Sequence, residues 1–129
     1  MQTVKLAVVG AHLKDMPLHW QLTSRDAKFV GAFETAPNYR LYAMADSVPP
    51  KPALVHCEDG AAIKVEVYKL GVAEFGSFVA EVPPPLAIGT VTLADGSSVK
   101  GFVSEPRATE GAEDVTALGG WRAYIAQLA

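Results

Sequence analysis

Cysteine is almost absent from this sequence of 129 residues, in which Cys57 stands alone. One cysteine cannot form an intramolecular disulfide, so a disulfide-stabilised secreted domain is excluded. The sequence also lacks a secretory leader and any apolar run of about 20 residues, the length that a membrane-spanning helix needs. We therefore expect a protein of the reducing cytoplasm that has no membrane partner.

Cys57 itself is interpreted as a structural residue. A nucleophilic cysteine needs a base or a helix N-terminus beside it, and here His56 precedes it directly. Adjacent residues of a strand point to opposite faces of the sheet, so these two side chains are not expected to act together.

Clusters of basic residues are missing as well. The chain has 11 Lys and Arg against 14 Asp and Glu, a formal net charge of −3, and its basic residues are scattered. Such a chain offers no continuous surface to a phosphate backbone, so we expect no nucleic-acid partner. Its histidines and its cysteine do not have the spacing of zinc ligands, and no metal site is expected.

The motifs of several enzyme classes are absent too. There is no Walker A loop and no Gly-x-Gly-x-x-Gly fingerprint, and no cofactor is expected. A Gly-x-Ser-x-Gly elbow and the glycine- and serine-rich loop of a Ser/Lys amidase are also missing. The chemistry that remains is proton transfer, carboxylate binding, or binding without catalysis.

What the chain does contain is enough apolar material for one domain, residues 1–129, since half of its residues are apolar. The aliphatic run 4–9 predicts a central strand buried on both faces. Asp95 and Gly96 predict a tight turn between strands at 88–93 and 98–105. Further strands are predicted at 28–35, 39–45, 53–56 and 62–70, the last two as a hairpin around Asp59 and Gly60. In 62–70 the alternation of Ile63, Val65 and Val67 with Lys64 and Glu66 predicts a half-exposed strand.

Helical spacing of apolar residues occurs in the middle and at the end of the chain. Val72, Phe75, Val79 and Val82 predict an amphipathic helix over 72–81, which ends before three prolines at 83–85. Residues 121–128 predict a last helix, with an apolar stripe of Trp121, Tyr124, Ile125 and Leu128. A short helix is predicted at 17–25, and the prolines within 46–52 predict an exposed connection.

Together these elements predict an α+β fold. We expect a small curved, mostly antiparallel sheet or partly closed barrel of six or seven strands, with two or three short helices covering its open side.

The candidate ligand site is the loop that leaves the first strand, formed by Gly10, Ala11, His12 and Leu13. A glycine at such an exit lets backbone N–H groups turn toward a bound anion or oxyanion. His12 is the candidate catalytic residue, because imidazole titrates near neutral pH and moves a proton at little cost. The alternative is a tight strand exit that carries a solvated histidine.

A second candidate contact for an anion lies at residues 39–42. Arg40 could hold a carboxylate through its planar guanidinium, with Tyr39 beside it. We expect Tyr39 and Tyr42 to face one way on this strand and Arg40 the other. The alternative is a pair of core or rim tyrosines with a surface arginine.

Several of these segments, in this order, resemble the C-terminal domain of allophanate hydrolase. The resemblance rests on Val-Gly-Ala-His-Leu at 9–13, Met-Pro-Leu at 16–18, Tyr-Arg-Leu-Tyr at 39–42 and Gly-Gly-Trp-Arg-Ala-Tyr at 119–124. It continues through 35–37, 75–78, 83–91 and 100–102. The resemblance covers residues 6–124 and implies a γ-glutamylcyclotransferase-like fold.

The resemblance also implies a function in urea and allophanate degradation, where this domain promotes decarboxylation of the N-carboxycarbamate that an amidase domain forms. The implied ligand is a small carboxylate or carbamate, and loop 10–13 would hold it while His12 donates or relays a proton. The other implied substrate contacts are Tyr39, Arg40, Ser77, Ile88 and Gly89.

Other functions stay open from the sequence. One is a noncatalytic assembly module for a separate amidase or urea carboxylase, anchored by Trp121, Tyr124 and Phe78. The partner in such an assembly could also be a second copy of this chain, giving a homodimer. Another is γ-glutamylamine cyclotransferase chemistry with Glu81 as the base, although the tyrosine of that family's Tyr-Gly-Ser/Thr-Leu loop is missing here.

Overall fold

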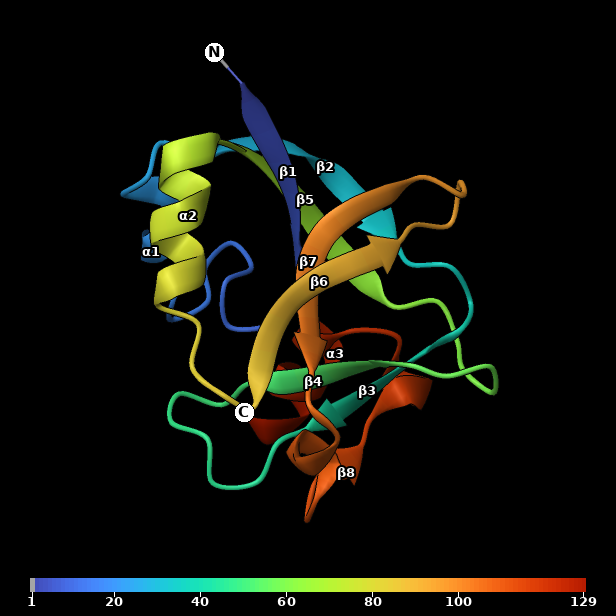
Figure 1. Ribbon diagram of the computed structural model, residues 1–129. Coiled ribbons are helices and arrows are strands. Elements are labelled where there is room, and N and C mark those ends of the chain that lie inside the picture. Colours follow the sequence, from blue (N-terminus) through green and yellow to red (C-terminus); the bar gives the residue numbers. More distant parts are fainter. Residues whose placement is uncertain (1) are drawn as a thin grey trace.

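A computed structural model describes residues 2–129 and contains eight strands in two sheets, with three α-helices around them (Figure 1). The larger sheet has the strand order β2-β5-β1-β7-β6, and the smaller has the order β4-β3-β8. The strands are β1 (Thr3–Val8), β2 (Lys28–Glu34), β3 (Tyr39–Ala43), β4 (Pro52–His56), β5 (Lys64–Gly71), β6 (Leu86–Thr92), β7 (Ser98–Ser104) and β8 (Glu113–Asp114). The helices are α1 (Trp20–Thr23), α2 (Val72–Ala80) and α3 (Trp121–Leu128), with 3-10 turns η1 (Pro106–Thr109) and η2 (Thr116–Leu118).

The predicted α+β class is confirmed, and so is a mostly antiparallel sheet. Among the strand pairs of the described residues, β1 and β7 alone run parallel. The eighth strand, one more than expected, is the two-residue β8. No apolar pattern marks a strand of two acidic residues, and it forms because Tyr42 and Ala43 of β3 pair with it.

Strand β1 occupies the centre of the larger sheet, between β5 and β7. Its second half is buried, from Leu6 to Val8, whereas Thr3 and Lys5 are exposed. The expectation of a strand buried on both faces therefore holds for its second half only. The burial increases toward Val8, where the chain enters the candidate loop.

The larger sheet curls back on itself at one end. Thr35, just after β2, forms an isolated antiparallel bridge with Leu93, just after β6. Ala36 N–H donates to Thr92 O (2.9 Å) and Ala94 N–H donates to Glu34 O (2.8 Å) across the same junction. The two edge strands thus meet at their ends only, and the barrel stays open.

The predicted hairpin between β4 and β5 is wrong. β4 pairs with β3 in the smaller sheet, whereas β5 pairs with β1 and β2 in the larger one. The proline-rich connection at 46–51 is instead the loop of the β3–β4 hairpin. Ile63, Val65 and Val67 are buried as the alternation predicted, and a strand with so much apolar surface is best buried in the middle of the larger sheet.

The hairpin of β6 and β7 is confirmed. Their register runs from Leu86 opposite Ser104 to Thr92 opposite Ser98. Gly96 in the turn has a φ of 88°, a conformation that glycine adopts without steric cost.

The predicted helices are present, with two differences. The segment 17–25 is mostly turns, and its α-helical part is the four-residue α1. On α2 the buried residue is Phe78, 1% exposed, while Val72 from the predicted stripe is 49% exposed. The aromatic ring, which buries more apolar surface than a valine, sets which face of α2 packs on the sheet. α2 covers the larger sheet on one side (Figure 1).

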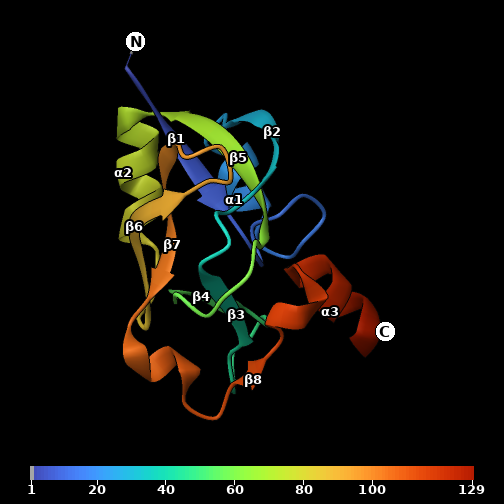
Figure 2. The ribbon, with the colours of Figure 1, turned by 90° about the vertical axis from the view of Figure 1, so that its right-hand side faces the viewer.

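Helix α3 lies next to the loop that follows β1 and beside the start of β5 (Figure 2). Trp121 at its start is buried, as predicted, whereas Leu128 near its end is exposed. Arg122 ties the helix to the body of the protein by donating to Lys14 O (2.9 Å) and to Glu66 Oε2 (2.6 Å). No helix within residues 2–129 has the length and apolar character needed to cross a membrane.

Candidate functional site

The loop from Gly10 to Leu13 is buried along its whole length. Leu13 N–H donates to Gly10 O (3.0 Å) and closes a turn, and Leu18 N–H donates to Ala11 O (2.8 Å). A side chain at position 10 has no room, because a Cβ there would lie 2.1 Å from Cδ of Pro52. The glycine is therefore required by a close approach to the smaller sheet, at a place where its φ is not positive.

His12 points into the protein and is 8% exposed. Its ring stacks on Phe102 with centroids 5.0 Å apart, and its edge meets Phe78 at 5.1 Å. Nε2 is 2.8 Å from Oε1 of Gln21. The solvated histidine considered from the sequence is therefore not what the structure shows.

Burial lowers the pKa of His12 from 6.5 to about 4, because a charged imidazolium loses its hydration between two aromatic rings. The hydrogen bond with Gln21 opposes this shift, whereas the positive charges of Lys51 and Arg25 and the neighbouring His19 add to it. His12 is thus neutral at pH 7 and holds no spare proton.

A cavity of about 150 Å³ opens beside the His12 ring. Its polar wall is formed by Gln21, Lys51 and Glu81, and its apolar wall includes Leu86 and Phe102. A separate space of about 10 Å³ is lined by Gly10 and Ala11 and shares His12 and Lys51 with the cavity. The histidine and a lysine therefore border a cavity of the size of a small organic acid, and the candidate loop lies next to it.

Three backbone N–H groups of the loop are without an acceptor among the described residues. Leu13 N–H is used within the turn, and Lys14 N–H donates to Glu66 Oε1 (3.0 Å). Within residues 2–129, the N–H groups of Gly10, Ala11 and His12 donate to no other protein atom. All three residues line the smaller space beside Lys51, and a cluster of backbone N–H donors of this kind can bind an anion.

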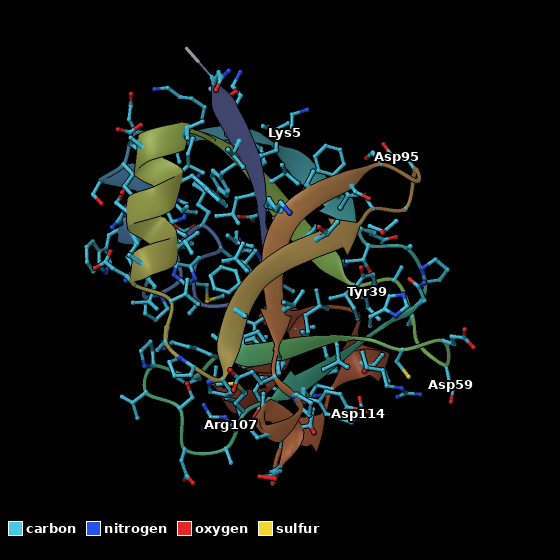
Figure 3. All side chains as sticks on the ribbon, in the orientation of Figure 1. Lys5, Tyr39, Asp59, Asp95, Arg107 and Asp114 are labelled. Atoms are coloured by element: carbon cyan, nitrogen blue, oxygen red, sulfur yellow. The ribbon has the colours of Figure 1, made fainter. Side chains whose placement is uncertain are left out.

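Tyr39 and Arg40 lie away from this cavity. Tyr39 is buried in the core, and its hydroxyl accepts a hydrogen bond from Thr92 N–H (3.0 Å). The guanidinium of Arg40 pairs with Asp114 (2.8 Å) and Asp59 (3.4 Å). Figure 3 shows Tyr39, Asp59 and Asp114 far from α2. Neither side chain lines the space around His12.

Tyr42 shares the face of Arg40, not that of Tyr39. Tyr39, Leu41 and Ala43 are buried, while Arg40 and Tyr42 are half-buried. The expectation that both tyrosines face one way was wrong, because positions three apart on a strand fall on opposite faces.

The remaining predicted contacts lie near the cavity without lining it. Ser77 on α2 accepts a hydrogen bond from Arg25 Nε (2.8 Å). Ile88 and Gly89 are on β6, and the residues that reach the cavity from this segment are Pro83 and Leu86. Glu81 does reach the cavity, and its carboxylate forms an ion pair with Arg25.

A larger groove of about 530 Å³ lies on the other side of the candidate loop. Leu13 lines it, together with Phe33 on β2, Val65 on β5 and Trp121 on α3. Successive residues of the loop thus face two different spaces, His12 the small cavity and Leu13 the groove. Within residues 2–129 no group of three or more His, Cys, Asp or Glu side chains is placed to hold a metal ion.

Comparison with known proteins assigns the family. Residues 4–126 match the sequence model of the allophanate hydrolase C-terminal domain. The chain belongs to this family. It is 45% identical over 128 residues to the urea amidolyase of Lachancea kluyveri, covering 95% of this chain but 7% of that protein. The chain therefore spans less than a tenth of the length of this relative.

Solved structures of the allophanate hydrolase family have the same fold. Kluyveromyces lactis allophanate hydrolase superimposes with a TM-score of 0.96 at 43% identity, over 100% of this chain and 22% of that one. The protein c4763, described as specific to uropathogenic E. coli, has a TM-score of 0.90 at 35% identity over 98% of both chains. A γ-glutamyl cyclotransferase, 12% identical with a TM-score of 0.62, shares the fold alone over 88% of this chain and 70% of that one.

In this allophanate hydrolase C-terminal domain, two residues beside His12, Lys51 and Gln21, were not expected from the sequence. Lys51 belongs to the predicted exposed connection, yet it borders both spaces beside His12. A lysine between prolines was the available signal, because a rigid loop can hold a charge in a fixed place. Gln21 gave no signal of its own, since its contact with His12 depends on how α1 folds back on the loop.

Proposed function

We propose that this domain binds a small carboxylated carbamate in the cavity beside His12 and promotes decarboxylation of N-carboxycarbamate during cytoplasmic urea and allophanate degradation. The observation that carries the proposal is a buried, neutral imidazole next to a lysine and a loop with three unpaired backbone N–H groups. Membership of the allophanate hydrolase C-terminal family supports the choice of substrate.

The anion would be held from two sides. Lys51 supplies a full positive charge, and the N–H groups of Ala11 and His12 supply two donors at a loop where little water competes. Leu86 and Phe102 give the cavity an apolar wall, which favours release of a neutral product over retention of a charged one.

The reaction breaks the C–N bond to one carboxylate of N-carboxycarbamate. The electron pair of that bond goes to nitrogen, which takes up a proton, and carbon dioxide leaves together with carbamate. Because His12 is neutral at pH 7, it acts as a relay: it passes a proton from water to the nitrogen as the C–N bond breaks, and the hydroxide left behind combines with the released carbon dioxide to give bicarbonate. A pKa near 4 makes the transient imidazolium a strong donor.

The test measures carbon dioxide release from N-carboxycarbamate that an amidase lacking this domain generates from allophanate. We expect the purified protein to increase the rate of release, and His12→Gln and Lys51→Met to remove most of the increase. His56→Gln and Lys69→Met serve as matched controls, because both side chains are exposed and lie outside the cavity. Equal release with and without the protein would exclude the proposal.

A second candidate is an assembly module for an amidase or urea carboxylase. The aromatic residues first suggested as anchors are largely internal: Trp121 and Phe78 are buried, and Tyr124 stacks on Trp121. This candidate is favoured by the exposure of several large apolar side chains, Trp20 and the β2 residues Phe29, Val30 and Phe33. Co-sedimentation with either partner, lost on Phe29→Ser, would support it. The same experiment measures whether the chain forms a homodimer.

The cyclotransferase alternative depends on Glu81 as a base. The carboxylate of Glu81 borders the cavity but is engaged by Arg25, and 48% of its side chain is exposed. This alternative requires that the protein turn over a γ-glutamylamine and that Glu81→Gln abolish the turnover.

A further inference from the structure

We infer that Gln21 is a positioning residue that fixes the tautomer and the orientation of His12, so that Nδ1 is left as the nitrogen that exchanges protons. The inference rests on the proposed function for its catalytic consequence. Its structural part, the tautomer of His12, stands on the geometry of these two residues.

The hydrogen bond between Gln21 and His12 selects one tautomer of the imidazole. Oε1 of Gln21 is 2.8 Å from Nε2 of His12, and an amide oxygen accepts. With the amide in this orientation, Nε2 carries the proton of the neutral ring and Nδ1 is bare, whereas an amide turned by 180° would place the proton on Nδ1. A bare nitrogen is the one that can take a proton from water and return it to a substrate.

Gln21 is the group that holds the ring against rotation. Within residues 2–129 it forms a hydrogen bond with the His12 ring, while the rings of Phe78 and Phe102 pack against that ring. Aromatic faces confine the plane of an imidazole but do not distinguish its two nitrogens. Without Gln21 the ring can turn by 180° in its slot and exchange the positions of Nδ1 and Nε2.

Gln21 is itself fixed by its surroundings. Its N–H donates to Leu18 O (3.0 Å), and its carbonyl accepts from Arg25 Nη1 (2.9 Å). Arg25 is tied in turn to Ser77 on α2 and forms the ion pair with Glu81. A chain of contacts thus runs from α2 through Arg25 and Gln21 to the histidine.

Other charges also act on His12, so a pH profile alone cannot isolate Gln21. Lys51 faces the ring from the β3–β4 loop, Arg25 and His19 from the α1 segment, and Glu81 from the end of α2. His19 acts on the backbone, because its Nδ1 lies 2.9 Å from His12 O. The test must therefore identify the protonated nitrogen directly.

The experiment records histidine side-chain nitrogen shifts by NMR at pH 7 in protein labelled with ¹⁵N. We expect His12 of the unaltered protein to be the Nε2–H tautomer. Gln21→Leu should give a mixture of tautomers, while Gln21→Glu, which keeps an acceptor at the same place, should retain the tautomer and raise the pKa of His12. Gln127→Leu, at an exposed position on α3, is the matched control and should change neither.

The same variants are then assayed for carbon dioxide release. We expect Gln21→Leu to reduce kcat by roughly tenfold with little change in KM. The reduction is smaller than the whole rate factor of acid–base catalysis, because His12 itself remains. An Nδ1–H tautomer in the unaltered protein, or an unchanged tautomer in Gln21→Leu, would overturn the inference. If the spectrum shows the Nε2–H tautomer but the protein does not increase carbon dioxide release, the tautomer assignment stands and the proposed function is excluded. If Gln21→Leu fails to fold, the spectra of the unaltered protein and Gln21→Glu are compared. Different His12 tautomers in these two proteins would overturn the inference.

Discussion

The rings of His12 and Phe102 lie nearly parallel, with an interplanar angle of 20° and their centroids 5.0 Å apart. This contact joins the loop after β1 to the middle of β7, two segments 90 positions apart in the sequence. It also removes water from one face of the imidazole, which is why the histidine stays neutral well below pH 6.5.

The first prediction concerns the dependence of stability on pH. The pKa of His12 is about 4 in the folded protein and 6.5 when exposed, so the unfolded state binds more protons between these values. His12 therefore makes the free energy of unfolding fall as the pH is lowered from 6.5 to 4, by about 3 kcal/mol in all. Urea unfolding of His12→Gln should lack this component.

His56→Gln serves as the control for this measurement, since His56 is exposed. Its unfolding free energy should follow that of the unaltered protein across the same pH range. Parallel pH curves for His12→Gln and the unaltered protein would show that His12 is not shielded from solvent.

The second prediction concerns Lys51 and uses malonate, a stable small dicarboxylate. Loss of a charged hydrogen-bond donor costs about 1.5–3 kcal/mol, so Lys51→Met should weaken malonate binding by about tenfold or more in calorimetry. Lys69→Met removes an exposed lysine outside the cavity and should bind like the unaltered protein. Equal affinities in all three proteins would place malonate elsewhere.

The third prediction concerns the close approach of Gly10 to Pro52. Gly10→Ala places a Cβ 2.1 Å from Pro52 Cδ, and overpacking of this kind costs about 1–3 kcal/mol. Gly76→Ala is the control: its Cβ meets nothing within 4 Å and it lies inside α2, where alanine stabilises by about 0.5–1 kcal/mol. Thermal unfolding should therefore shift in opposite directions for the two variants.

The fourth prediction concerns which face of α2 packs on the sheet. Phe78→Ala removes a buried ring beside His12 and should cost about 3–5 kcal/mol of unfolding free energy. Val72→Ala changes an exposed side chain and should cost less than about 0.5 kcal/mol. Similar losses for both variants would show that Val72 packs on the sheet, as the predicted stripe required.

Sequence reasoning succeeded where the deciding contacts are local. Asp95 and Gly96 specify a turn within four residues, and the β6–β7 hairpin follows from it. Gly10 and His12 adjoin a buried strand, and the loop between them could be singled out for that reason. The alternation of Ile63, Val65 and Val67 also predicted their shared burial correctly.

It failed where segments distant in the chain decide the outcome. β4 and β5 look like a hairpin because few residues separate them, yet each finds a better partner in a different sheet. Lys51 enters the cavity only because the β3–β4 loop folds over Gly10, and Gln21 meets His12 only because α1 turns back. No periodicity in either segment could have indicated these contacts.

The contact of Gly10 with Pro52 has a consequence for how the two sheets behave on ligand binding. Gly10 leaves the larger sheet and Pro52 begins β4 in the smaller one, so the cavity lies at the seam between them. An anion held by Ala11 on one side and Lys51 on the other would link the loop after β1 to the β3–β4 loop, and so restrain the two sheets relative to each other. Amide hydrogens of β4 should then exchange more slowly when the cavity is filled, although the strand itself does no chemistry.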